Sequence, residues 1–63
     1  MLEFLLIFHS DPVRASTTAI LRADLEDEAM HKARSIALYD GRTVELWRNQ
    51  RMLARFPSQE HRG

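Results

Sequence analysis

The side chains of this chain that could do chemistry are three histidines, four serines and two groups of charged residues. His9, His31 and His61 are candidate metal ligands, but they lack the i,i+4 or H-x-H spacing that brings two imidazoles to one ion. The sequence has no G-x-S-x-G nucleophile elbow, no phosphate-binding glycine motif and no cysteine. Most of its carboxylates fall in one solvated stretch rather than in a cleft. We therefore predict no metal site, no cofactor and no catalytic residue, and we expect that the chain is not an enzyme.

Arginines gather in the C-terminal third of the chain and suggest a second kind of chemistry. Arg48, Arg51 and Arg55 follow or flank Trp47, and arginines beside an aromatic ring can hold phosphates while a base stacks on the ring. Over the whole chain, however, nine basic residues balance nine acidic ones, so no charge excess draws it to nucleic acid. We expect that nucleic acid is not its partner, and we keep an accessory nucleic-acid-binding role for these arginines as the alternative function.

Two strands are predicted before residue 24. Leu2 to Phe8 is rich in aromatic and branched side chains and stops at the turn signal Ser10-Asp11-Pro12. The stretch from Ser16 to Arg22 is rich in β-branched residues and contains no breaker. Because the connection is short, we expect the two strands to pair as a hairpin.

An amphipathic helix is predicted from Asp24 onward, where the hydrophobic period changes from 2 to 3.6. Asp24 is the predicted N-cap, three acidic residues follow in the first turn, and Gly41 supplies the positive φ at which helices often end. The apolar stripe of this helix consists of Leu25, Ala29, Ala33, Ile36 and Ala37. We expect this stripe to pack on a sheet.

Two further strands are predicted at Thr43–Arg48 and Met52–Phe56, around the turn Asn49-Gln50, with a polar tail at residues 58–63. Two registers are open here, because Leu46 can lie opposite Leu53 or Ala54 and Trp47 opposite Met52 or Leu53. The predicted fold is α+β in the order β-β-α-β-β: one domain, residues 1–57, with a four-stranded antiparallel sheet and one helix packed on one face. The predicted core consists of Phe4, Leu6, Phe8, Leu25, Ala29, Ala33, Ile36, Val44 and Leu46.

The apolar run from Phe4 to Phe8 indicates that both faces of the sheet carry apolar side chains, since successive residues of a strand point to opposite faces. One helix can cover only one face, and a chain of 63 residues has little material for a second layer. The predicted interaction surface consists of Leu5, Ile7, Trp47 and Leu53. We expect a homodimer, or a protein partner, on that face; the alternative is that these residues form only an extended margin of the core.

The segment from Asp24 to Phe56 resembles a group of small uncharacterised alphaproteobacterial proteins. In that group an acidic helix is followed by a D-G-x-x-V-E-L-W strand and an R-x-x-A-R-hydrophobic strand, which correspond here to Asp40–Trp47 and Arg51–Phe56. The resemblance implies the same element order and a bacterial cytoplasmic setting, and it transfers no catalytic or binding residue. The apolar run near Met1 is too short for a spanning helix and lacks a basic leader, which agrees with a cytoplasmic protein without a membrane partner.

Overall fold

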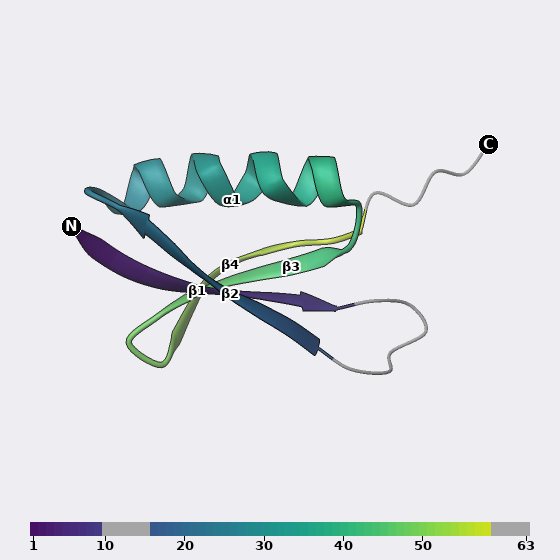
Figure 1. Cartoon of the computed structure of the whole chain (residues 1–63), viewed down its shortest axis with the longest axis horizontal. Coiled ribbons are helices and arrows are strands. Elements are labelled where there is room, and N and C mark those ends of the chain that lie inside the picture. Colours follow the sequence, from purple (N-terminus) through teal and green to yellow (C-terminus); the bar gives the residue numbers. More distant parts are fainter. Residues whose placement is uncertain (10–15, 59–63) are drawn as a thin grey trace.

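The computed structural model describes residues 1–9 and 16–58, and it places one helix across one face of a four-stranded antiparallel sheet (Figure 1). The elements are β1 (Leu2–His9), β2 (Ser16–Ala23), α1 (Glu26–Asp40), β3 (Thr43–Arg48) and β4 (Arg51–Phe56). This confirms the predicted α+β fold and its order β-β-α-β-β. The predicted turn at residues 10–12, and the tail with His61 beyond residue 58, lie outside the described residues.

The strand order in the sheet is β2-β1-β3-β4, which makes β1 and β3 the inner strands. β1 pairs with β2 along the whole strand, from Leu2 opposite Ala23 to His9 opposite Ser16. On its other side β1 pairs with β3, from Leu5 opposite Trp47 to His9 opposite Thr43. The crossover through α1 therefore places the second hairpin beside the first strand, and β2 and β4 form the two edges.

The core lies between α1 and the sheet. From the strands it takes Phe4, Leu6, Phe8, Ala23, Val44 and Leu46, and from the helix Ala29, Ala33 and Ala37. Alanines on the buried face of the helix let its backbone approach the sheet closely, and the large side chains of β1 and β3 fill the space beneath. Seven of the nine predicted core residues belong to this core, and an eighth, Ile36, packs against it at its margin.

The start of α1 differs from the prediction. The N-cap position is Leu25, not Asp24, and Leu25 makes no side-chain capping bond. Its side chain is 65% exposed, so its place in the predicted core is wrong. Instead, the Asp24 backbone N–H donates to Glu28 Oε1 at 3.1 Å, which satisfies one of the free donors that precede a helix. At the other end Gly41 has φ 88° and donates to Ala37 O at 2.8 Å, as predicted.

The turn between β3 and β4 fixes a register that combines the two predicted ones. Asn49 and Gln50 have φ of 53° and 64°, so both lie in the left-handed region, as in the two-residue type I′ hairpins that suit the sheet twist. Trp47 lies opposite Met52, and Leu46 lies opposite Ala54. Leu53 is therefore the extra residue of a β-bulge.

Asp40 and Arg42 form an ion pair at the end of α1. Arg42 Nε donates to Asp40 Oδ2 at 2.6 Å and Nη2 donates to Oδ1 at 3.1 Å, while the guanidinium lies 4.9 Å from the centre of the Phe8 ring. A carboxylate in the last turn of a helix is opposed by the macrodipole, and Arg42 compensates that charge. The side-chain hydrogen bond from Arg42 lowers the pKa of Asp40 below its usual value; burial opposes this, and the charge of Arg42 adds to the lowering.

This ion pair predicts a pH-dependent contribution to stability. The pKa of Asp40 is lower in the folded than in the unfolded chain, so the pair stabilises the fold fully above about pH 4 and less as the pH falls through the folded value. We expect Asp40→Asn to melt at a lower temperature than the wild type at pH 7. That difference should shrink as the pH is lowered below about 4. Thermal unfolding followed by circular dichroism measures it, with Arg42→Gln as a matched variant that should show the same loss. A difference independent of pH would contradict the assignment.

Among the described residues, no helix is long and apolar enough to cross a membrane.

Candidate functional site

The candidate functional site is the face of the sheet that points away from α1, here called the open face. The alternation of the strands and the pairing registers place on it every second residue of β1 and its neighbours in the adjoining strands. Its members are Glu3, Leu5, Ile7, His9, Ser16, Thr18, Ile20, Arg22, Thr43, Glu45, Trp47, Met52 and Arg55. No described element covers this face, because the only helix lies on the other side of the sheet (Figure 1).

Apolar side chains form a continuous row across all four strands of the open face. Leu5 of β1 lies opposite Ile20 of β2 on one side and Trp47 of β3 on the other, and Trp47 lies opposite Met52 of β4. Leu5 and Trp47 are half-buried by their neighbours, whereas Ile20 is 58% exposed and Met52 45% exposed. The sheet therefore shields the middle of the row and leaves its two ends open to water.

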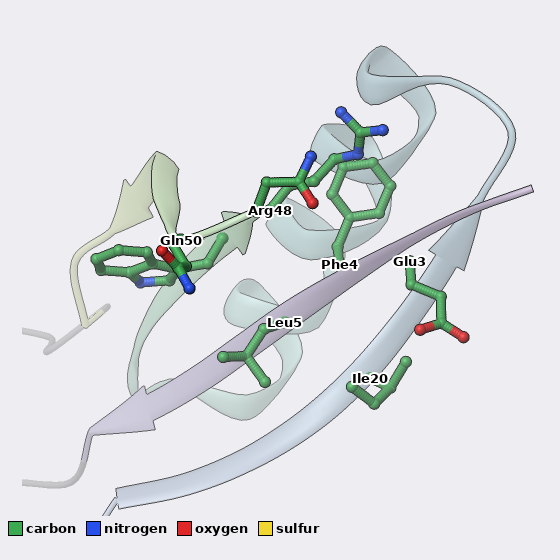
Figure 2. A pocket seen from close by; sticks show the side chains of 8 residues that line it. Glu3, Phe4, Leu5, Ile20, Arg48 and Gln50 are labelled. Atoms are coloured by element: carbon green, nitrogen blue, oxygen red, sulfur yellow. The ribbon is translucent and has the colours of Figure 1, made fainter.

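A shallow pocket of about 280 Å³ lies at one end of the open face, next to the β3–β4 turn. Its apolar lining is Phe4, Leu5, Ile20 and Trp47, and its polar lining is Glu3, Arg48, Asn49 and Gln50. Figure 2 shows Leu5 and Ile20 on neighbouring strands, with Gln50 on the far side of the hollow. A hollow of this size fits one or two apolar side chains of another protein, and is at the small end for a specific small-molecule site.

A polar network crosses the other end of the open face. Trp47 Nε1 donates to Glu45 Oε1 at 2.9 Å, Glu45 Oε2 lies 3.3 Å from His9 Nε2, and His9 Nδ1 lies 3.4 Å from Ser16 Oγ. His9 Nε2 is enclosed but lacks hydrogen-bond geometry to the carboxylate, so the two groups attract each other as charges only when His9 is protonated. The network ties β2, β1 and β3 together and fixes the orientation of the indole.

Ser16, His9 and Glu45 resemble in order the nucleophile, base and carboxylate of an acyl-transfer triad. Both of their contacts are at the long end for hydrogen bonds, and the His9–Glu45 contact lacks the alignment that would hold the base. The pocket beside the β3–β4 turn is lined by neither Ser16 nor His9. The arrangement stiffens the face and gives no support to catalysis.

The structure separates the predicted site residues. Leu5, Ile7 and Trp47 lie together on the open face, but Leu53 packs against the core at the bulge and does not belong to this surface. That prediction rests on the register in which Trp47 lies opposite Leu53; because Trp47 lies opposite Met52 instead, alternation puts Leu53 on the helix side. Ile20 and Met52, the most exposed apolar residues of the face, were not among the predicted site residues, although alternation from Leu5 and Trp47 could have found them.

The three candidate anion-binding arginines do not share one face. Arg48 lies on the helix side, 5.9 Å from the Phe4 ring centre and 4.0 Å from Glu26, and Arg51 lies opposite it in the hairpin. Arg55 is on the open face, opposite Glu45. A phosphate backbone could follow only one of these sides, so the geometry gives the nucleic-acid alternative little support. Within residues 1–9 and 16–58, no three His, Cys, Asp or Glu side chains gather as a metal site would require.

No protein-family model, no curated protein and no solved structure matches this chain.

Proposed function

We propose that this protein is a small protein-interaction module that self-associates through the open face. The observation that carries the proposal is the uncovered apolar row from Ile20 through Leu5 and Trp47 to Met52. Covering such side chains is favourable by about 25 cal/mol for each Å² of apolar surface removed from water. A domain of this size has a stability of only a few kcal/mol, so that gain is large relative to its own fold.

The charges of the open face are compatible with association between two copies. Arg22 is paired with Glu3 at 3.2 Å, and Glu45 accepts a hydrogen bond from Trp47 and lies opposite Arg55 in the β3–β4 pair. Charges that are compensated within one copy do not repel the same charges on a second copy, and they offer little to a strongly charged partner. A twofold contact between identical faces is the commonest way to cover one surface of this kind.

The size of the open face indicates a reversible dimer. Four strands about 4.8 Å apart and six to eight residues long give a face of roughly 400 to 500 Å² on each copy. A standard stable interface covers about 800 Å² on each partner. We therefore expect a dimer that forms in the micromolar range and dissociates on dilution.

The test is sedimentation velocity of the whole chain over a concentration series, with two methionine variants. Met52→Lys places a charge on the open face, where Met52 is 45% exposed, and Met30→Lys places one on the helix, where Met30 is 38% exposed. We expect the wild type and Met30→Lys to shift from monomer to dimer with rising concentration, and Met52→Lys to remain monomeric over at least a tenfold wider range, about 1.4 kcal/mol of association free energy. A monomeric wild type at high micromolar concentration would refute self-association.

Salt distinguishes this function from the alternative. The association constant of an apolar interface changes little between low and moderate salt. Affinity for phosphates falls steeply as the salt concentration rises, because such binding releases counterions. The same series at two salt concentrations should therefore give similar association constants.

A further inference from the structure

We propose that β2 is a second contact surface, at which the β2 strands of two copies pair antiparallel and join two four-stranded sheets into one continuous sheet. The inference goes beyond the open face, because strand pairing uses the backbone groups at the edge of the sheet and leaves both faces as they are.

The two edges of the sheet differ in their protection. The β4 edge carries the bulge at Leu53 and two exposed arginines, Arg51 and Arg55, and both bulges and charges discourage pairing with another strand. β2 pairs with β1 along eight residues without a shift in register, and its sequence contains no proline. Its single charged residue, Arg22, is already bonded to Glu3. β2 is therefore a long, regular and unprotected edge.

The helix side of this edge is also incompletely packed. A hollow of about 370 Å³ is lined by Leu21 of β2 and by a flank of α1 that includes Lys32, Ser35 and Ile36. Leu21 and Ile36 are only half-buried there. On the opposite side of the same strand, Ile20 is 58% exposed. A strand added beside β2 would cover apolar side chains on both sides of the sheet.

Symmetry and charge favour a second copy as the added strand. Antiparallel pairing about a twofold axis perpendicular to the sheet places residues of the same face opposite each other, so the axis must pass midway between the two copies of one β2 residue. Lys32 Nζ donates to the Arg22 carbonyl at 3.3 Å, and a centre at Ala19 leaves that group at the end of the new ladder. In this register Thr18 lies opposite Ile20 of the second copy, a pair of β-branched residues.

The charges near the edge do not oppose this arrangement. With the centre at Ala19, the two Arg22 residues are six positions apart along the strands, or about 20 Å, which exceeds the screening length of about 8 Å at physiological salt. Lys32 lies 3.7 Å from Glu28 of its own helix, so its charge is also compensated within one copy. The twofold axis makes the two helices antiparallel, and antiparallel macrodipoles attract each other.

The test uses single cysteines, because the chain has none of its own. Ala19→Cys places two thiols at the symmetry axis, with Cα atoms about 4.5 to 5.5 Å apart, within the range of a disulfide. Arg51→Cys on the β4 edge is the matched control. Each variant is oxidised with diamide at low micromolar concentration, and the covalent dimer is quantified on a non-reducing gel. We expect about five times more dimer for Ala19→Cys than for Arg51→Cys, because only the former thiols are held at bonding distance.

Two further samples give the experiment its specificity. Thr18→Cys mixed with Ile20→Cys should cross-link better than either variant alone. In the proposed register position 18 of one copy lies opposite position 20 of the other, and neither position lies opposite itself. Because a disulfide traps a β2-paired dimer even where it is too sparsely populated to sediment as a dimer, Ala19→Cys in the Met52→Lys background should cross-link as before. Loss of the open-face contact is thereby distinguishable from loss of edge pairing. Equal yields for Ala19→Cys and Arg51→Cys, or equal yields at every β2 position as in unspecific strand stacking, would overturn the proposal.

Discussion

Phe4→Ala should leave the protein largely unfolded at room temperature. Phe4 is 1% exposed and is among the largest fully buried side chains. Replacing a buried phenylalanine by alanine costs about 3 to 5 kcal/mol, which equals the whole stability expected of a domain with a single small core. Urea unfolding followed by circular dichroism should show either no cooperative transition or a midpoint far below that of the wild type.

The neighbouring residue provides the control for this prediction. Leu5 has the same strand environment but points to the open face, where it is half-buried and not part of the helix-side core. Leu5→Ala should keep a cooperative transition while weakening the association of two copies. Equal loss of stability for both variants would show that the open face is part of the folding core of a single copy.

Ala33→Leu should have the second largest effect, because it enlarges the helix surface at a fully buried position. Ala33 is 0% exposed, and beneath the helix Val44 and Leu46 are also 0% exposed, so the added atoms have no space. Overpacking of this kind costs about 1 to 3 kcal/mol and shifts the backbone. Denaturant unfolding should report the loss.

The control for this substitution is Arg34→Leu, one residue further along α1. Arg34 is exposed, and leucine and arginine have similar helix propensities, so its stability should change little. If Ala33→Leu were as stable as Arg34→Leu, the close approach of α1 to the sheet would be refuted.

The elements of this fold could be predicted because they depend on local patterns. Four features each depend on residues within a few positions of one another: the alternation in β1, the 3.6 period of α1, Gly41 after the helix and the Asn49-Gln50 turn. The same alternation placed Leu5, Ile7 and Trp47 on one face. Local geometry decides these features whatever the rest of the chain does.

The predictions that failed lie where local pattern and packing disagree. Leu25 has the right spacing for the helix stripe, but the helix begins at Glu26, so Leu25 lies outside it and stays exposed. Leu53 was expected opposite Trp47, but Met52 takes that position, so Leu53 lies on the helix side and packs against the core. Both outcomes depend on how neighbouring elements pack and pair, and the spacing of residues does not encode that.

Residue pattern alone specifies the elements, the helix-side face of β1 and the presence of a second apolar face. Residue pattern does not specify that β1 lies between β2 and β3; this order follows from packing and brings His9 to Glu45 and Leu5 to Trp47. Packing also decides that the edges are the regular β2 and the bulged β4. The physical reason is that strand order depends on the packing of residues about 40 positions apart, whereas the period of a strand or helix is fixed by the geometry of its own backbone.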